Sequence, residues 1–333
     1  MSKKISIIIP VYNGQKYISH CVDSVLGQEN FDIHDLDILL LNDGSRDKSL
    51  GMINGYKEKY PDIIRVFSHK NMGVANTRNK GISLASGKYT MFIDQDDFID
   101  KDFCGVLYRE AESGGYDVVC SGMRRPDENG KIVTKTKYKD TYFARFMCMS
   151  VWAKVHRTDF LRSKKLKIFD NHQGEDIVFS FEVAQKTENI KCIDYCGYNW
   201  FYNEGSVSNT TQRGLDESNI KSILNVQNRL ADIDIKKDNI STFFVTMVTA
   251  YYIFFVGRSS TPDEFNSGLK VLMGNLKTRY PNYNKNHYLW VAPRGILPIF
   301  SIGVKVFMIM YSLNIIGLFA KFYCKGKKQE DSV

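Results

Sequence analysis

The chain has 333 residues and a mass of 38.3 kDa, which suits one large α/β domain with an appendage or two modest domains. Its hydrophobic share of 43% and charged share of 25% are those of a globular protein and exclude a largely disordered or fibrous chain. The 45 Lys and Arg residues exceed the 37 Asp and Glu residues, giving a net charge of +8. This positive excess could serve binding to nucleic acid, to an anionic membrane or to an anionic substrate, or it could serve solubility alone.

The seven cysteines are odd in number and scattered, which argues against a disulfide framework and for buried, reduced thiols. Cys192 and Cys196 have CxxxC spacing, but neither a second pair nor a histidine cluster accompanies them, so the spacing disfavours a zinc site. Near the N-terminus only the segment 5–9 is continuously apolar before Pro10. This segment is too short for a signal peptide, so we expect none, and it predicts a buried strand.

Strand-like and helix-like segments alternate over the first hundred residues. Continuous apolar runs predict strands at 5–10, 37–41, 63–67 and 89–93. Helical spacing of apolar residues predicts helices between them, at 17–26, 47–60 and 74–85. This alternation predicts βαβ units and a mostly parallel sheet. Because the strands are apolar throughout, helices are expected on both faces of the sheet, and the fold class is α/β.

The remaining elements are less regular. A helix is expected at 103–113 and a strand at 117–120, followed by a charged, loop-like stretch at 123–140 with the character of an exposed edge strand. After about residue 214 the pattern becomes helical. The segments 214–234 and 262–280 are amphipathic, and 241–257 is uncharged. We therefore expect an α/β domain at 1–212, with halves at 1–122 and 123–212, and a helical region at 213–333.

Polar residues follow three of the first four predicted strands. The clusters are Tyr12-Asn13, Asn42-Asp43-Gly44-Ser45 and Asp94-Gln95-Asp96-Asp97. Ligands of open α/β sheets bind beyond the carboxyl ends of the strands, so these clusters are expected to converge on one crevice.

Three carboxylates lie within four residues in the third cluster, at Asp94, Asp96 and Asp97. Such carboxylates repel one another unless a cation or hydrogen-bond donors share their charge. Hard oxygens at a strand end suit Mg²⁺ or Mn²⁺. The alternative is a helix cap within a solvated acidic loop.

Two further side chains are candidates for ligand contacts. Asp43 could accept a hydrogen bond from a nucleobase, or it could close an Asx-turn. Arg78 lies in a predicted helix that starts after Gly73, where its guanidinium could bind a diphosphate or could pair with a surface carboxylate.

Four motifs in this order and spacing resemble family 2 glycosyltransferases of the GT-A fold: residues 6–13 (SIIIPVYN), 41–45 (LNDGS), 71–81 (NMGVANTRNKG) and 92–97 (FIDQDD). The resemblance is strong over 5–100, weaker to about 208 and absent beyond. It implies a nucleotide-diphospho-sugar donor with UDP as the expected carrier, a Mn²⁺ or Mg²⁺ cofactor, and inversion at the anomeric carbon.

The resemblance also implies roles for individual residues. Those assigned to the donor are Pro10, Tyr12, Asn13, Asp43, Arg78 and Asp94, with Tyr12 stacking on the base and Asp43 reading its edge. Those assigned to the metal are Asp96, Asp97 and Asp94, with Asp96 or Asp97 favoured as ligand. The sequence departs from the family at Asn42, where Asp is more usual, so no role is assigned to that position.

An inverting transferase needs a general base that deprotonates the acceptor hydroxyl. The Glu175-Asp176 pair matches the ED motif of the family, which implies that Asp176 is the base and Glu175 its acidic neighbour. Acidic residues in a first helical turn also complement the helix dipole, which is the structural alternative. Trp152 and Lys154 resemble a segment that precedes this motif and are assigned to the acceptor side, although Trp152 could equally be core.

The segment 295–320 carries a single charge, Lys305, and is interrupted by Pro298. We expect it to be an amphipathic or membrane-inserted segment rather than a clean span, with a buried helix as the alternative. The lysines that follow it, and a second basic run at 154–167, suit an anionic leaflet. The resulting hypothesis is a transferase attached to the cytoplasmic face of the membrane that acts on a lipid-diphosphate-linked glycan in capsule or cell-envelope assembly.

Other functions fit the sequence less well. A catalytically silent nucleotide-sugar-binding or scaffold subunit would not need both acidic motifs. A nucleotidyltransferase would need a basic Gly-rich loop after the first strand, which the segment 12–15 does not provide. No nucleic-acid-binding motif is recognisable, so no nucleic-acid partner is expected. The sequence leaves the oligomeric state open.

Overall fold

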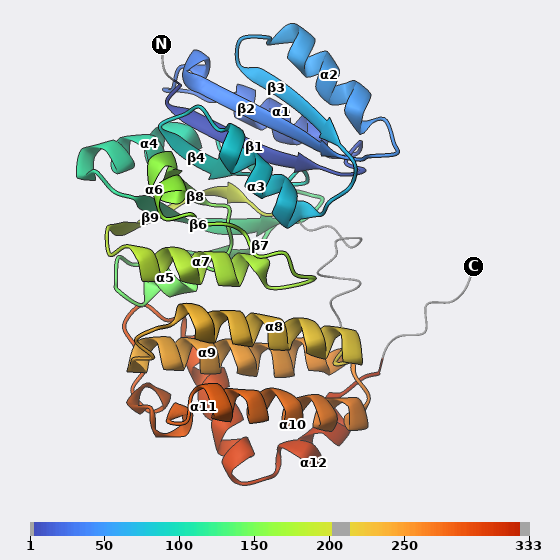
Figure 1. Cartoon of the computed structure of the whole chain (residues 1–333), viewed down its shortest axis with the longest axis vertical. Helices are drawn as coiled ribbons and strands as arrows, with labels where there is room; N and C mark the ends of the chain where they lie inside the picture. Colours follow the sequence, from blue (N-terminus) through green and yellow to red (C-terminus); the bar gives the residue numbers. More distant parts are fainter. Residues whose placement is uncertain (1–2, 202–213, 327–333) are drawn as a thin grey trace. The chain divides into compact units, whose positions relative to one another are not determined.

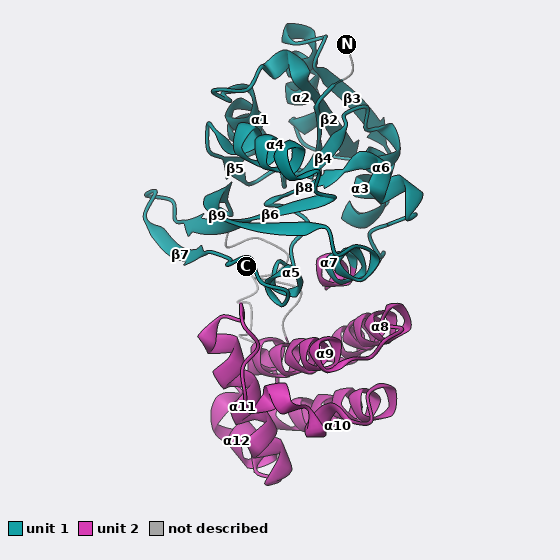
Figure 2. Cartoon of the chain, turned by 90° about the vertical axis from the view of Figure 1, so that its left-hand side faces the viewer, with its two compact units in different colours: residues 1–170, 179–203 teal, residues 171–178, 204–333 magenta. Residues whose placement is uncertain are grey.

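The fold is taken from a computed structural model that describes residues 3–201 and 214–326. Two compact units are distinguished: unit 1 contains residues 1–170 and 179–203, and unit 2 contains residues 171–178 and 204–333 (Figure 2). The expected domain boundary at 212/213, and Lys327 and Lys328 of the basic tail, lie outside the described residues.

The first half of unit 1 consists of parallel strands that alternate with helices (Figure 1). The elements are β1 (Ile5–Val11), α1 (Ile18–Leu26), β2 (Leu36–Asp43), α2 (Ser49–Lys59), β3 (Ile64–His69), α3 (Val74–Leu84) and β4 (Tyr89–Phe92). A short 3₁₀ turn, η1 (Ile33–Asp35), precedes β2. Every residue of β1, β2 and β4 is buried, which explains why their sequences lack polar alternation.

The second half of unit 1 adds antiparallel pairs, so the nine-stranded sheet is mixed, with the order β3-β2-β1-β4-β8-β6-β9-β5 and β7 beside β6. The elements are β5 (Phe98–Ile99), α4 (Phe103–Gly114), β6 (Val118–Pro126), β7 (Ile132–Thr136), α5 (Ala144–Met147), β8 (Lys154–Arg157), α6 (Thr158–Ser163), α7 (Glu175–Lys186) and β9 (Ile190–Asn199). Strand β8 runs antiparallel to both β4 and β6. The parallel pattern expected from the sequence therefore describes the first four strands and the β6–β9 pair.

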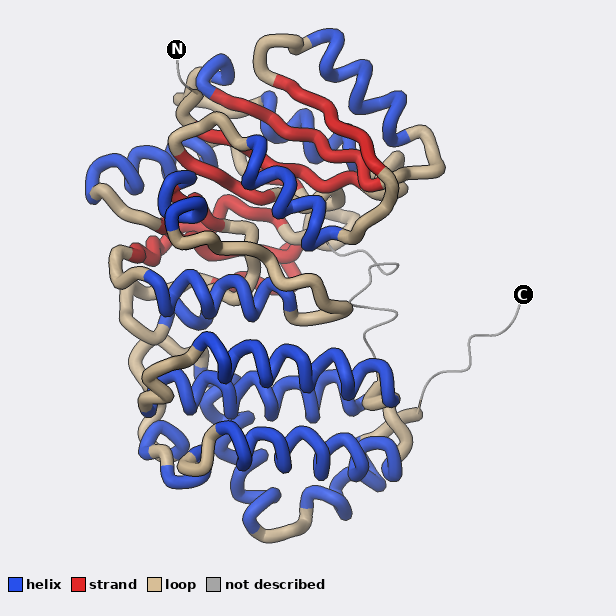
Figure 3. The backbone as a smooth tube through the Cα atoms, viewed as in Figure 1, coloured by secondary structure: helices blue, strands red, loops and turns tan. Residues whose placement is uncertain are grey.

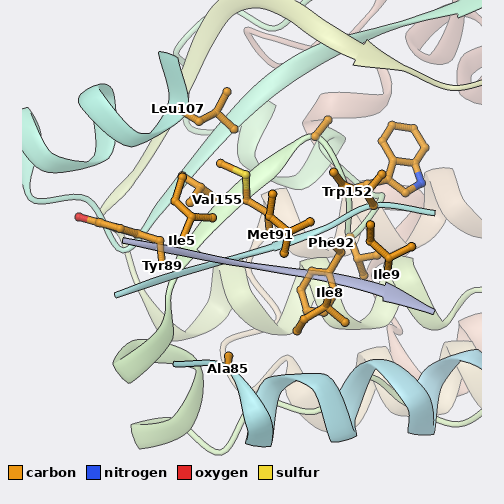
Figure 4. Close-up of a cluster of buried hydrophobic side chains, with 14 of the residues drawn as sticks. Ile5, Ile8, Ile9, Ala85, Tyr89, Met91, Phe92, Leu107, Trp152 and Val155 are labelled. Atoms are coloured by element: carbon orange, nitrogen blue, oxygen red, sulfur yellow. The ribbon is translucent and has the colours of Figure 1, made fainter. Parts of the chain in front are cut away.

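Helices cover both faces of the sheet. Figure 2 shows α1 and α4 on one side of the strands and α3 and α6 on the other. The core between these layers is built mainly from the continuous apolar strands (Figure 4). Helix α3 approaches β1 closely at Gly81, where an added Cβ would lie 2.5 Å from the Ile8 side chain. The glycine at position 81 is therefore needed for packing rather than for a turn.

Unit 2 contains helices and loops only among its described residues (Figure 3). Apart from the first turn of α7, its elements are α8 (Glu217–Ile233), α9 (Asn239–Tyr251), η3 (Tyr252–Val256), η4 (Gly257–Ser259), α10 (Pro262–Arg279), η5 (Tyr283–Lys285), η6 (His287–Leu289), α11 (Pro298–Ser312) and α12 (Ile316–Tyr323). Helix α10 starts with a capping box between Thr261 and Glu264, which satisfies the first orphan N–H groups of the helix. Helices α8, α9 and α10 pack against one another.

Among the described residues, the continuous helical stretch Asn239–Ser259 is long and apolar enough to cross a membrane. Within this fold, however, 78% of its most apolar window is buried, as in the core helix of a helical domain. The segment expected to associate with a membrane, 295–320, is not one helix. It is divided between α11 and α12, whose axes differ by 120° across the break at Leu313–Ile315. Asn314 occupies the left-handed conformation there, with a φ of 56°.

Candidate active site

The three polar clusters that follow β1, β2 and β4 meet at one edge of the sheet, as the sequence predicts. The backbone N–H and C=O of Tyr12 are bound by the side-chain amide of Gln95, both at 2.9 Å. The N–H of Asn13 donates to Ser45 Oγ, and Asn13 Oδ1 accepts from the N–H of Arg46. These bonds join the first loop to both others. The Tyr12 side chain remains 44% exposed, and Pro10 is buried at the end of β1.

Asp43, at the end of β2, is buried and binds the loop that precedes α3. Its carboxylate accepts from the N–H groups of Met72 at 2.7 Å and Gly73 at 3.0 Å. Gly73 has a φ of 85°, so the glycine at this position provides a backbone conformation that other residues rarely adopt. The carboxylate of Asp43 therefore fixes the start of α3. Asn42 takes a structural role as well, donating to Ser68 Oγ and accepting from the Ser45 N–H.

Arg78 lies in α3 with its side chain only 4% exposed, and it pairs with Asp94. The distance from Arg78 Nη2 to Asp94 Oδ1 is 2.5 Å. A guanidinium buried at this depth is suited to orienting a carboxylate, because its charge-assisted hydrogen bond holds Asp94 while that carboxylate stays partly exposed. The guanidinium expected to bind a diphosphate thus pairs with Asp94 in this structure.

Asp97 is only 1% exposed, whereas Asp94 and Asp96, the other two carboxylates of the acidic loop, are half-buried. Its Oδ2 accepts from the hydroxyl of Tyr198 at 2.6 Å, and its Oδ1 accepts from the N–H of Phe201 at 2.9 Å. Burial raises the pKa of Asp97 well above its ordinary value, and the charges of Asp94 and Asp96 act in the same direction. Asp97 therefore joins the acidic loop to β9 and the residues after it.

Tyr198 is a residue of the site that the sequence analysis missed. Besides donating to Asp97, its hydroxyl accepts a hydrogen bond from the N–H of Asp94 at 3.2 Å. Its ring stacks on Trp152, with centroids 4.6 Å apart and an interplanar angle of 6°. No signal in the sequence singles out Tyr198, since tyrosines are common in strands and β9 lies about a hundred residues after the acidic loop.

Asp96 is half-buried and lines a cavity of about 340 Å³ in unit 1. The other residues that line this cavity are Lys16, Tyr17, His20, Phe98, Pro126, Asp127, Glu128, Gly130 and Phe201. Asp94 is half-buried as well. Among the three carboxylates, these two are the ones that solvent and a bound cation can reach.

Trp152 and Lys154, the residues expected on the acceptor side, are both buried in unit 1. Trp152 is 9% exposed and belongs to the core through its stack on Tyr198. Lys154 is 4% exposed, and its ammonium donates to the carbonyl of Cys148 and to Ser180 Oγ. The sequence could not reveal this, because lysine is seldom buried and its exposure is the ordinary expectation.

Glu175 and Asp176 form the first turn of α7, as the ED motif implies, and they belong to unit 2. Gly174 precedes them with a φ of 77°, and a Cβ at this position would lie 2.2 Å from the hydroxyl of Tyr252. Tyr252 is buried. Burial raises its pKa, and Tyr251, Glu175 and Asp176 add to the rise. The turn that carries the acidic pair therefore packs tightly on the helical unit.

Comparison with known proteins agrees with this geometry. The model of glycosyl transferase family 2 matches residues 6–208. A cholesterol galactosyltransferase of Borreliella burgdorferi is 28% identical over 228 residues, and glycosyltransferase EpsJ of Bacillus subtilis, itself uncharacterized, is 30% identical over 220 residues. The two matches cover 62% and 61% of this chain and 62% of each relative, so the chain spans less than two thirds of these proteins.

Solved structures share the fold at low identity. Residues 1–349 of TarS from Staphylococcus aureus, in complex with UDP-GlcNAc, superpose with a TM-score of 0.63 at 19% identity, covering 85% of this chain and 92% of that TarS fragment. The mannosyltransferase PcManGT of Pyrobaculum calidifontis, in complex with GDP-Man and Mn²⁺, gives a TM-score of 0.56 at 12% identity, covering 97% and 86% of the two chains. The family match covers more than half of the chain, and the fold is that of GT-A enzymes. The chain therefore belongs to glycosyl transferase family 2.

Proposed function

We propose that the chain is an inverting, metal-dependent glycosyltransferase that moves a sugar from a nucleotide-diphospho-sugar, with UDP as the expected carrier, to a glycan acceptor. The observation that supports this proposal most strongly is that the loops after β1, β2 and β4 are hydrogen-bonded to one another at one edge of the sheet. There an exposed aromatic ring, Tyr12, and two accessible carboxylates, Asp94 and Asp96, lie on loops joined by direct hydrogen bonds. A nucleotide base needs an aromatic face, and a diphosphate needs a cation held by hard oxygens.

In this proposal the base stacks on Tyr12, with Pro10, Asn13 and Asp43 shaping its pocket. Asp96 and Asp94 hold Mn²⁺ or Mg²⁺, and Arg78 keeps Asp94 in position. A bound cation supplies Lewis-acid stabilisation of the charge that develops on the departing diphosphate. We favour Asp96 over Asp97 as the ligand, because both oxygens of the buried Asp97 already accept hydrogen bonds. The Mn²⁺ in the PcManGT complex supports a divalent cation for this fold.

Asp176 is proposed as the general base that removes the proton from the acceptor hydroxyl, with Glu175 as its acidic neighbour. Support comes from the match to the ED motif and from the rigid setting of the turn, since Gly174 leaves no space for a larger residue beside Tyr252. A base held in this way keeps its carboxylate near one position during attack, which is what general-base catalysis requires.

For the acceptor, we propose a glycan linked to lipid diphosphate at the cytoplasmic face of a membrane. The relatives named as cholesterol galactosyltransferase and poly(ribitol-phosphate) beta-glucosyltransferase act on a lipid and on a phosphate-containing polymer by name. The exposed apolar residues of α11 and α12 support contact with lipid; they are Ile299, Ile302, Val306, Ile309, Leu318 and Phe322. Lys321 and Lys325 are exposed in and after α12, where they could meet anionic headgroups.

The enzymatic proposal is tested with a panel of nucleotide sugars incubated with purified protein, Mn²⁺ or EDTA, and an undecaprenyl- or polyprenyl-diphosphate glycan acceptor. We expect release of nucleoside diphosphate with one class of donor, and we expect EDTA and Asp176→Asn each to abolish it. Tight donor binding without turnover for any acceptor would instead favour a nucleotide-sugar-binding subunit.

The membrane proposal has its own test, using the full chain with Leu318→Asp and Phe322→Asp in α12. These side chains are 59% and 90% exposed, so the substitutions should leave folding intact and reduce sedimentation with vesicles that contain anionic lipid. Ile235→Asp is the matched control, since Ile235 is 87% exposed in the loop after α8. Equal vesicle binding by all variants would contradict lipid contact through α12.

A further inference from the structure

Three buried cysteines that the proposed reaction does not use lie close together in unit 1. The sulfur atoms of Cys120, Cys148 and Cys192 lie within 4.8 Å of one another, and all three thiols are free. Two thiolates bound to one Zn²⁺ at about 2.3 Å in tetrahedral geometry would have their sulfurs about 3.8 Å apart. The cluster therefore matches the spacing of ligands around a single ion, within small side-chain adjustments.

The sheet brings these residues together from distant parts of the sequence. Cys120 of β6 is paired with Cys192 of β9 in the parallel ladder and with Lys154 of β8 in the antiparallel ladder. Paired residues of neighbouring strands point to the same face of a sheet, so these three side chains share a face. The CxxxC spacing of Cys192 is misleading, because Cys196 donates to the carbonyl of Thr136 and is not part of the cluster.

Lys154 brings a positive charge into this buried region, and no ion pair with a carboxylate is seen for it within residues 3–201 and 214–326. Its two hydrogen-bond acceptors, the Cys148 carbonyl and Ser180 Oγ, are both neutral. A buried ammonium is costly unless an anion compensates it, and thiolate is the anion that this region can provide.

His156 lies two residues after Lys154 on the same face of β8 and is fully buried. Its ring packs against the rings of Phe92 and Phe179 and is not part of the cluster of ligand atoms, which among the described residues consists of the three sulfurs. The site therefore rests on the three thiols.

We propose that Cys120, Cys148 and Cys192 form a three-thiolate site for one thiophilic divalent cation of the zinc class. On binding, the three thiols release their protons to solvent and bind as thiolates. The charges of three thiolates, one divalent cation and the Lys154 ammonium sum to zero, so metal binding would compensate the buried charge of Lys154. The ion would tie β6, β9 and the segment after α5 together. It is distinct from the cation of the acidic loop, whose oxygen ligands select hard ions.

The test uses the full chain, reduced and stripped of metal, titrated with Cd²⁺ while thiolate-to-metal charge-transfer absorption is recorded in the ultraviolet. We expect a saturable band at one Cd²⁺ per chain, displaced by Zn²⁺. Cys120→Ser and Cys192→Ser should weaken binding by more than about 100-fold, because even outer-shell changes cost 10–100-fold. Cys104→Ser, at another fully buried thiol, and Asp96→Asn should leave the band unchanged.

A second measurement needs no variant and so does not depend on their folding. The wild-type protein is alkylated with N-ethylmaleimide in mild urea, with and without Zn²⁺, and the modified cysteines are identified by mass spectrometry. The proposal predicts slower alkylation at Cys120, Cys148 and Cys192 but not at Cys21 or Cys104. Equal protection of all five thiols, or a Cd²⁺ band that persists in Cys120→Ser, would overturn the site while leaving the proposed transferase activity unaffected.

Discussion

Removal of a single hydroxyl group, in Tyr198→Phe, tests whether β9 positions the acidic loop. The phenylalanine ring can keep the stack on Trp152 and the contact with Phe103. What is lost is the hydrogen bond to Asp97 Oδ2 at 2.6 Å and the acceptor for the Asp94 N–H at 3.2 Å. Both bonds are made by the fully buried hydroxyl, so neither group gains water as a substitute.

Loss of a buried hydrogen bond to a carboxyl group costs about 1–3 kcal/mol, and we expect a decrease of this size in the free energy of unfolding of unit 1. The hydroxyl also lowers the pKa of Asp97, so its removal should shift Asp97 further toward the neutral form. With the loop less firmly held, the apparent affinity for Mn²⁺ should fall by about 10-fold or more, as is typical when the support of a metal ligand is removed.

The assays are urea unfolding and a Mn²⁺ titration of nucleoside diphosphate release. Tyr195→Phe is the matched control, because the Tyr195 hydroxyl donates to Asp102, outside the acidic loop. Tyr195→Phe should lose stability but keep the Mn²⁺ dependence of the wild type. A wild-type Mn²⁺ dependence in both variants, or an equal shift in both, would show that the Tyr198 hydroxyl does not position the acidic loop.

Two further predictions concern stability. Gly174→Ala should lower the free energy of unfolding by about 1–3 kcal/mol because of its positive φ, and by about 1–3 kcal/mol more because its Cβ overlaps Tyr252. Gly115→Ala has a φ of 62° and open space at its Cβ, so it should lose only the first amount. Equal urea midpoints for the two variants would contradict the overlap. Burial alone would raise the pKa of Asp37, but hydrogen bonds from Arg65, Ser6 and Ser86 outweigh it and hold the pKa below its ordinary value of about 3.9. The stability that this carboxylate contributes is therefore present above that pH and is lost as the pH falls through the lower folded pKa. Asp37→Asn should be less stable at neutral pH and lose less stability on acidification, and a wild-type slope in thermal unfolding between pH 5 and pH 2 would count against this.

The strands and helices in the first half of unit 1 can be predicted from the sequence, because the local hydrophobic pattern of each segment matches its place in the folded sheet. Apolar runs gave β1, β2, β3 and β4 within about two residues of their ends, since strands buried on both faces need no polar alternation. The convergence of the three polar clusters followed from the rule for parallel sheets, and the bonds from Gln95 to Tyr12 confirm it.

The rest depended on contacts between residues far apart in the sequence. The link between Tyr198 and Asp97 spans about a hundred residues, and the three clustered thiols come from three separate elements. The burial of Lys154, expected on the acceptor side, cannot be seen in the sequence, because a buried lysine is recognised only when its neighbours are known. The segment 295–320 has the composition of one apolar helix, but the left-handed Asn314 ends α11 and redirects the chain.

We propose that the acidic loop holds the cation that activates a nucleotide-sugar donor. Calorimetric titration of UDP, UDP-GlcNAc and GDP-mannose into wild-type protein and Asp96→Asn, each with Mn²⁺ and with EDTA, tests this directly. We expect the wild type to bind one nucleotide class more tightly with Mn²⁺, and we expect Asp96→Asn to lose this Mn²⁺ effect without a change in thermal unfolding. Nucleotide binding that is equally tight with EDTA, or a Mn²⁺ effect that survives in Asp96→Asn, would contradict this proposal.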